Sequence, residues 1–391
     1  MNADLRRVDR AHVWKQDRRA GQLARHGSIV TFAYEEGYDG PAVATSLPVG
    51  SEPVVAAAGA VPAFFAGLLP EGRRLTALHR ALKTSADDEL TLLMAVGGDP
   101  VGDVRILPAD VDVPQPEPIV RWDPRETVDF SELAGDVIDR KALAGVQDKV
   151  SAAMITLPAQ AAGREAILKL TPPEYPHLVD NEAYFLGLAA RAGLTVPRFQ
   201  VVHDLRGEPG LLVERFDRVG TQRRAVEDAA QVMGLYPAQK YAVTMEQVSL
   251  ALMAPCRARP VAARDLFRMV VFAWLTGNGD LHAKNLAILD VDGEWRISPV
   301  YDVPSSLPYG DTTSALTVAG RDHDLSRRSL LDFADALSLT AKAAVVVLDH
   351  LLEATQEVIA VWSDAEIEFT RPRNHEVLRH LRARRRALAA S

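Results

Sequence analysis

The feature that most constrains this chain is a polar loop between a buried helix and a hairpin. An apolar helical pattern over residues 267–275 runs into Gly277, where we expect the helix to end. The loop after it carries four polar side chains within six residues: Asp280, His282, Lys284 and Asn285. Residues 290–293 end in glycine between two short apolar runs, which predicts a hairpin. The hairpin turns the chain back, so Asp302 is expected close to Asp280 and Asn285.

These are the groups that phosphoryl transfer requires. Asp280 and Asn285 have the spacing Asp-x-x-x-x-Asn of a kinase catalytic loop. The Asp280 carboxylate would orient an attacking hydroxyl, while Asn285 and Asp302 would hold Mg²⁺. Lys284 would neutralise charge on the transferred phosphoryl group. Each residue taken singly also fits a polar loop with turn hydrogen bonds, but their order around a hairpin favours the kinase interpretation.

Size and charge narrow the class of protein. A chain of 391 residues predicts two or three domains. A net charge of −8 argues against nonspecific binding of nucleic acid as the main activity. Residues 1–7 contain no apolar signal segment, and the apolar stretch 269–275 is too short to span a bilayer. We therefore expect a cytoplasmic protein without a membrane partner.

The order of patterns along the chain predicts its domains. Short strands within residues 12–34 are followed by helical patterns over 68–82 and 89–94. Residues 108–118 are rich in proline and acidic side chains, which is typical of a linker. We predict an N-terminal subdomain over 1–118, a nucleotide-binding lobe over 119–235 and a helical lobe over 236–391.

The second domain has candidates for binding a nucleotide. Lys169 lies in a predicted strand, 166–170, and Glu182 lies in the first turn of a helix that we expect to begin at Asp180 as N-cap. Together they repeat the lysine–glutamate ion pair of kinases. An exposed strand lysine and a glutamate that only favours the helix dipole remain alternatives.

Two further segments are weaker candidates on their own. Gly145, between a predicted helix and a strand over 151–157, could begin a loop over phosphates, although one glycine alone favours a turn. The end of the predicted strand 211–216 overlaps the charged segment 214–218, which could form a hinge beside adenine. On their own, these five residues favour an ordinary charged strand end. The helices expected near 329–337, 341–357 and 374–388 are interpreted as scaffold.

Taken together, these motifs resemble the HipA-type serine/threonine kinase toxins of bacterial type II toxin–antitoxin modules, over nearly the whole chain. The matching segments are Leu-Leu-Pro-Glu-Gly at 68–72, Gly-Val-Gln-Asp-Lys at 145–149, Leu-Lys-Leu at 168–170, Asn-Glu at 181–182, Glu-Arg-Phe-Asp-Arg at 214–218, Glu-Asp at 227–228, Asn-x-Asp-x-His-x-Lys-Asn at 278–285 and Tyr-Asp at 301–302. The resemblance implies an α+β, protein-kinase-like bilobal fold with an N-terminal β-rich subdomain and a mainly helical C-terminal lobe.

The resemblance also implies ATP and Mg²⁺ and assigns roles to individual residues. Asp280 would be the catalytic base with Lys284 beside it, and Asn285 and Asp302 would bind the metal. The residues assigned to the nucleotide are Gly145, Val146, Gln147, Lys149, Lys169, Glu214, Phe216 and His282. Glu182 and Asp228 would have supporting roles.

The implied partners are a helix-turn-helix antitoxin of the HipB type, DNA reached only through that antitoxin, and an aminoacyl-tRNA synthetase as protein substrate. Phosphorylation of the synthetase would slow translation and growth. The chain departs from the family at Ala142, where members commonly carry a serine whose autophosphorylation silences the kinase. We therefore expect that self-inactivation route to be absent.

Other functions remain open from the sequence. Residues 278–285 are close to the loop of aminoglycoside and choline kinases, but Asn278 stands where those enzymes have histidine. A nucleotide-binding corepressor without catalysis is a second alternative. The arginines of the last predicted helix could contact nucleic acid or an acidic protein, but we expect them to be solvated: Arg379, Arg382, Arg384, Arg385 and Arg386.

Overall fold

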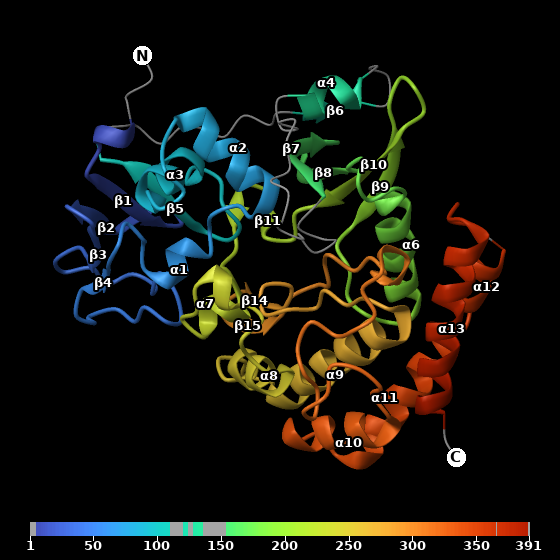
Figure 1. Ribbon diagram of the computed structural model, residues 1–391. Coiled ribbons are helices and arrows are strands. Elements are labelled where there is room, and N and C mark those ends of the chain that lie inside the picture. Colours follow the sequence, from blue (N-terminus) through green and yellow to red (C-terminus); the bar gives the residue numbers. More distant parts are fainter. Residues whose placement is uncertain (1–4, 110–119, 124–127, 136–153, 365, 390–391) are drawn as a thin grey trace.

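The computed structural model describes residues 5–109, 120–123, 128–135, 154–364 and 366–389. An N-terminal β-rich subdomain and a second sheet lie side by side above a mainly helical part (Figure 1). The predicted α+β class, with a β-rich N-terminal subdomain and a mainly helical C-terminal part, is therefore confirmed.

The N-terminal subdomain is an antiparallel sheet with helices packed on it. Its strand order is β4-β3-β2-β1-β5, so the first strand pairs with the last. The strands are β1 (Arg10–Lys15), β2 (Arg18–His26), β3 (Ile29–Tyr34), β4 (Val54–Ala56) and β5 (Val104–Pro108), and the helices are α1 (Ala63–Ala66), α2 (Gly72–Leu82) and α3 (Glu89–Val96). Alternating burial along β1 and β3 places Val13 and Phe32 in a core of their own.

The second sheet carries the predicted nucleotide-binding strand at its centre. Its order is β6-β7-β8-β10-β9, in which β6 and β7 are parallel and the other pairs antiparallel. The strands are β6 (Val120–Trp122), β7 (Ile155–Ala161), β8 (Arg164–Leu170), β9 (Phe199–His203) and β10 (Pro209–Glu214); α4 (Phe130–Gly135) and α6 (Leu178–Arg191) accompany them. The buried residues of α6 pack against this sheet, which fixes Glu182 opposite β8.

The helical part is joined to the sheets by a short antiparallel ladder. Strand β13 (Val226–Asp228) pairs with β14 (Ala287–Val291), which pairs with β15 (Glu294–Ile297) through the predicted hairpin. The small ribbon β11 (Arg218–Val219) and β12 (Gln222–Arg223) precedes them. The helices are α7 (Ala229–Val232), α8 (Met245–Met253), α9 (Arg259–Thr276), α10 (Arg327–Ala336), α11 (Ala341–Ala354), α12 (Val358–Ser363) and α13 (Arg371–Leu388). Helix α9 ends at Gly277 as predicted.

Some predicted boundaries are wrong. Asp180 is not an N-cap, because α6 begins two residues earlier and His177, in the left-handed conformation, precedes it. The predicted helix 341–357 ends at Ala354, where Thr355 turns the chain into α12. Strand β7 begins at Ile155, and β10 ends at Glu214 rather than at residue 216.

The prediction that the arginines of the last helix are solvated is wrong for Arg384. Its guanidinium lies 3.8 Å from the centre of the Trp274 ring and donates to the carbonyl oxygens of Trp274 and Thr312. Burial lowers the pKa of Arg384 to about 10. Helix α13 therefore packs against the end of α9 and is part of the core.

A buried cluster of ion pairs joins the N-terminal subdomain to the end of β10. Arg215 and Arg218 donate to Asp99 (2.7 Å each) and also to Asp217 (3.0 and 2.6 Å). Asp217 in turn accepts from the backbone N–H of Gly102 at 2.8 Å. We call these five residues the Asp99 cluster. Because its members come from both parts of the chain, it fixes the N-terminal subdomain against the second sheet.

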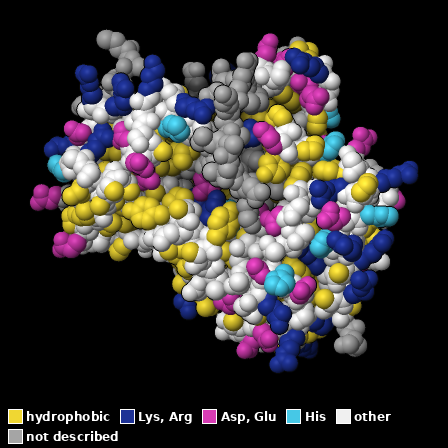
Figure 2. All heavy atoms as spheres, in the orientation of Figure 1, with side chains coloured by type: hydrophobic (Ala, Val, Ile, Leu, Met, Phe, Trp, Pro, Cys, Tyr) yellow, Lys and Arg dark blue, Asp and Glu magenta, His cyan; other side chains and the backbone are white. Residues whose placement is uncertain are grey.

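The surface view shows no single sign of charge dominating the visible face (Figure 2). Apolar atoms gather over the N-terminal subdomain, whose exposed apolar side chains include Ile29, Val49 and Val55. In the described ranges, no helix is both long enough and apolar enough to cross a bilayer.

Candidate active site

A cavity of about 420 Å³ lies where the N-terminal subdomain, the second sheet and the loop after α9 meet. Its lining includes most of the described residues that the sequence singled out: Lys169, Glu182, Glu214, Phe216, Asp228, His282, Lys284, Asn285 and Asp302. Segments 67–71 and 99–101 of the N-terminal subdomain form another wall. The structure thus gathers candidates from distant parts of the sequence around one space.

Lys169 lies between two carboxylates. Its Nζ donates to Glu182 Oε1 and to Asp302 Oδ1, both at 2.5 Å. Lys169 and Glu182 are buried, while the Asp302 side chain is about one third exposed. Burial alone would lower the pKa of Lys169, but the two carboxylates outweigh it and raise the pKa, so the lysine stays charged. The predicted Lys169–Glu182 ion pair is present.

The loop after α9 is held by its own side chains. Asn278 Oδ1 accepts from the Asp280 N–H at 2.9 Å, and Asn285 Nδ2 donates to the Asp280 carbonyl at 2.8 Å. Asn278 also donates to the carbonyl oxygen of Asp302 at 3.3 Å. Asp302 has φ +52°, a left-handed conformation that few residues other than glycine adopt. The loop and Asp302 are therefore fixed relative to each other, as the hairpin predicted.

Asn285 and Asp302 have the donor atoms that a magnesium site needs. Because the Asn285 amide nitrogen donates into the loop, its oxygen is the atom that can bind a cation. Among the described residues, no group of three His, Cys, Asp or Glu side chains could hold a metal ion. Mg²⁺ commonly takes one or two protein oxygens together with phosphate and water, which this pair fits.

Lys284 is bound from two sides. Its Nζ donates to Asp228 Oδ2 at 3.0 Å and to the carbonyl oxygen of Gly67 at 2.9 Å, and Glu71 lies 4.0 Å away. Burial alone would lower the pKa of Lys284, but Asp228 and Glu71 raise it. A charged lysine therefore stands in the cavity wall, placed partly by the N-terminal subdomain.

His282 supports the loop from inside. Its Nδ1 accepts from the Lys284 N–H at 3.2 Å, so in the neutral ring Nε2 carries the proton, 3.9 Å from Asp280 Oδ1. The side chain is 3% exposed. This geometry favours a role in positioning Asp280 and Lys284.

The segment at the end of β10, which we predicted to form a hinge beside adenine, lines the cavity. The N–H groups of Glu214 and Arg215 donate to the carbonyl oxygens of Arg198 and Glu165. The Phe216 ring stacks on Tyr301, with the ring centres 5.9 Å apart. The remaining nucleotide candidates, Gly145, Val146, Gln147 and Lys149, lie outside the described residues, as does Ala142.

Sequence reasoning missed several residues around the site. Glu71 was recognised only as part of a motif, and nothing in the pattern placed it beside Lys284. Lys240 and Tyr241 follow a short 3-10 turn and carry no motif, yet Lys240 pairs with Glu71 at 2.5 Å and Tyr241 packs on His282. These contacts depend on tertiary packing and give no periodic signal.

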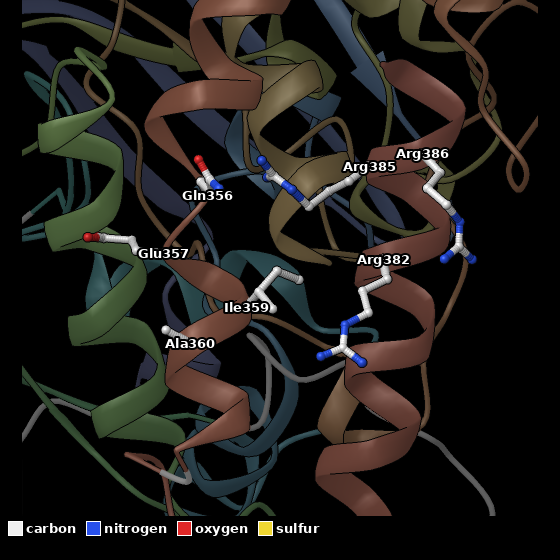
Figure 3. A pocket seen from close by; sticks show the side chains of 7 residues that line it. All are labelled: Gln356, Glu357, Ile359, Ala360, Arg382, Arg385 and Arg386. Atoms are coloured by element: carbon white, nitrogen blue, oxygen red, sulfur yellow. The ribbon is translucent and has the colours of Figure 1, made fainter. Parts of the chain in front are cut away.

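A second hollow, of about 590 Å³, lies between α12 and α13, far along the chain from this site. Figure 3 shows Arg385 extending toward Gln356, while Arg382 and Arg386 point in other directions. Arg385 donates to the carbonyl oxygens of Leu352 and Thr355 and thereby caps α11. The three guanidinium groups do not converge on one point, so we assign no ligand to this hollow.

A strand lysine paired with a helix glutamate, and a polar loop facing an aspartate beyond a hairpin, define a kinase-like phosphotransferase. The model of the HipA-like C-terminal domain matches residues 141–359, and that of the HipA N-terminal domain matches residues 11–107. The chain belongs to the HipA family, and it is a kinase of that family.

Relatives agree with this assignment. A protein of Sinorhizobium fredii named as a kinase, Y4mE, is 30% identical over 92% of this chain and 94% of its own length. The serine/threonine-protein kinase toxin HipA of Shewanella oneidensis is 28% identical over 76% of each chain. A solved complex of HipA, HipB and operator DNA from Shewanella oneidensis MR-1 contains a chain of the same fold, with a TM-score of 0.76, 20% identity and 96% of each chain covered.

Proposed function

We propose that this protein is an ATP-dependent serine/threonine-protein kinase that acts as the toxin of a type II toxin–antitoxin module. The observation that carries the proposal is the single cavity bordered by Lys169, Lys284, Asn285 and Asp302, with Asp280 in the same loop. These are the groups that bind phosphates, hold a metal and accept a proton in phosphoryl transfer.

In the proposed reaction, ATP binds with its adenine beside the segment that follows β10. The N–H groups of Glu214 and Arg215 are bound to protein carbonyls, so we expect Phe216 to meet the base with its backbone. Lys169 contacts the phosphates, and Asn285 and Asp302 hold Mg²⁺, which neutralises phosphate charge. The phosphate-covering role of residues 145–149 rests on the sequence motif.

The transfer step needs an oriented hydroxyl. Asp280 accepts a hydrogen bond from a serine hydroxyl of the protein substrate and takes its proton as the oxygen attacks the γ-phosphorus. The bond to the β-phosphate oxygen breaks and ADP leaves. Lys284, in the same loop as Asp280, lies in the cavity wall, where its charge stabilises the transferred group.

The toxin part of the proposal draws on relatives. The Shewanella oneidensis relative is named as a kinase toxin, and the solved complex of that organism contains HipB and operator DNA. By analogy, we propose a helix-turn-helix antitoxin as partner and DNA contact through that antitoxin. The motif resemblance to HipA-type toxins leads us to propose an aminoacyl-tRNA synthetase as the phosphorylated substrate.

Expression of the chain and of its Asp280→Asn variant in a bacterial host tests the proposal. We expect the unaltered chain to stop growth and to add phosphoserine to one synthetase, because only it retains the base. The matched control is Asp292→Asn, which makes the same change of charge at an exposed turn and should stop growth like the unaltered chain. Equal growth of all cultures, with no change in the phosphoproteome, would refute it.

A further inference from the structure

The Asp280 carboxylate is buried, although the proposed reaction requires it to meet a substrate hydroxyl. Its side chain is 1% exposed. In the described part of the chain, the cavity lining includes Lys284, Asn285 and Asp302 but not Asp280. A base at this depth cannot take a proton from another protein's serine until some group moves away from it.

Tyr241 covers this carboxylate. Its ring packs edge-on against His282, with the ring centres 5.1 Å apart, and its phenol lies close enough to the Asp280 carboxylate to feel that charge. Burial and the neighbouring carboxylate raise the pKa of the Tyr241 phenol, so it remains an O–H donor. The same side chain is 40% exposed. Tyr241 therefore extends from the protein surface to the proposed catalytic base.

Lys240, the residue before Tyr241, holds this segment against both the N-terminal subdomain and the loop after α9. Lys240 Nζ pairs with Glu71 Oε2 at 2.5 Å and lies 5.3 Å from the centre of the Tyr241 ring. The Lys240 carbonyl accepts from the Ala283 N–H at 3.3 Å. The cover is thus bound to the catalytic loop through its backbone and to the N-terminal subdomain through one ion pair.

We propose that Tyr241 is a gate over Asp280, and that its phenol hydroxyl occupies the place where the acceptor hydroxyl of a protein substrate binds. The gate rests on the proposed kinase function. A substrate segment must present its serine deeply enough to displace the phenol from Asp280, and the Glu71–Lys240 ion pair keeps the gate closed until then. The residue thereby selects for acceptors on a protruding or extended segment.

Chemical labelling of Asp280 tests the gate without requiring activity. The probe is glycine ethyl ester coupled by a carbodiimide, with the modified peptide quantified by mass spectrometry. Tyr241→Ala should raise the labelling of Asp280 severalfold, and Glu71→Gln should raise it less. Tyr38→Ala, at a half-buried tyrosine of the N-terminal subdomain, is the matched control and should leave labelling unchanged. Equal labelling of Asp280 in the unaltered chain and in Tyr241→Ala would overturn the proposal.

Kinetics separate a gate from a residue that only positions the base. With ATP and dephosphorylated casein as the probe substrate, Tyr241→Phe keeps the ring but removes the competing hydroxyl. We expect KM for casein to fall about fivefold, the size that one hydrogen bond contributes, with kcat maintained. Tyr241→Ala should also increase ATP hydrolysis without casein, because water reaches Asp280. A loss of kcat at unchanged KM would instead make Tyr241 a positioning residue and contradict the gate.

The two proposals fail in different ways. If neither the unaltered chain nor any Tyr241 variant transfers phosphate or hydrolyses ATP, the kinase function is wrong, while the labelling result still decides whether Tyr241 covers Asp280. If transfer depends on Asp280 and the Tyr241 variants behave like the unaltered chain in both assays, the kinase stands and the gate is wrong.

Discussion

At the scale of single residues, Lys169 illustrates how burial and charge are balanced in the site. Two carboxylates surround it, and Glu182 on one side has almost no contact with solvent. A buried ion pair contributes little net stability, because desolvation offsets the attraction, but removing one partner leaves a buried charge without compensation. The proposed function and the stability of the fold should therefore depend on Lys169 for different reasons.

Replacing Lys169 should separate these two effects. We expect Lys169→Met to lower kcat/KM about 100-fold, since the charge that we propose contacts the ATP phosphates is lost. The same change should lower the free energy of unfolding by about 3 kcal/mol, because Glu182 loses its cation. Urea denaturation measures the second effect.

The double variant Lys169→Met/Glu182→Gln is the control for this prediction. It should regain most of the stability, because no buried charge is left unpaired, but none of the activity. If Lys169→Met alone proved as stable as the unaltered chain, the ion pair would not contribute as described.

At the scale of elements, the predicted ends of α9 and of the hairpin after it were placed well because glycines mark them. Gly277 has φ +78°, and Gly293 in the hairpin has φ +83°. Both positions have a left-handed backbone, a conformation that glycine adopts readily, so a glycine in the sequence marks such a position directly. The surroundings of the two glycines differ, and only the structure shows this difference.

Alanine at each glycine should measure that difference. A Cβ at Gly277 would lie 2.4 Å from Cδ1 of buried Leu307, whereas one at Gly293 would meet nothing within 4 Å. We expect Gly293→Ala to cost about 1 kcal/mol, the price of the left-handed conformation alone. Gly277→Ala should cost about 3 kcal/mol, because overpacking adds to that strain. Thermal unfolding of both variants checks the order, and equal losses would contradict it.

Other element predictions failed where tertiary packing decided the outcome. Asp180 fits an N-cap by residue type, yet α6 begins earlier because buried Leu178 and Val179 extend it onto the core. The charge of Arg384 suggested a solvated side chain, yet its guanidinium packs on the Trp274 ring and donates to two backbone carbonyl oxygens. Charge and capping preferences are local, so neither could report a partner far away in the sequence.

At the scale of the whole molecule, the sequence predicted which residues meet but not which subdomain completes the site. The Lys169–Glu182 pair and the return of Asp302 followed from kinase spacing and the hairpin. The sequence did not predict the hydrogen bond from Lys284 to the carbonyl of Gly67 or the Asp99 cluster. These contacts join surfaces of two parts of the molecule that each have their own hydrophobic core. The domain limits at 118 and 235 remain a prediction.

The Asp99 cluster should make the molecule sensitive to acid. Burial alone would raise the pKa of Asp217, but Arg215 and Arg218 outweigh it and lower the pKa. The ionised Asp217 carboxylate therefore contributes its full stabilisation above the pKa that an aspartate has in the unfolded chain, about 4. That contribution is lost as the pH falls below this value. We expect the melting temperature to drop as the pH is lowered from about 5 to about 3.

Asp217→Asn should show that this cluster is responsible. At about pH 6 the variant should be less stable by about 3 kcal/mol, because two buried arginines lose a partner. Its melting temperature should then change less with acid than that of the unaltered chain. The exposed substitution Asp292→Asn should follow the unaltered chain at every pH. Identical acid profiles for all three proteins would rule out this role for Asp217.

The wall that residues 67–71 contribute to the cavity also has a consequence for synthesis of the chain. Residues 11–108 close their own sheet once β5 pairs with β1, so this part can fold while the ribosome is still translating. Lys284 and Asp302 emerge roughly two hundred residues later. A nascent chain therefore displays one finished wall of the cavity long before it holds Asp280, the proposed base, and the cavity is completed only as the last third of the chain leaves the ribosome.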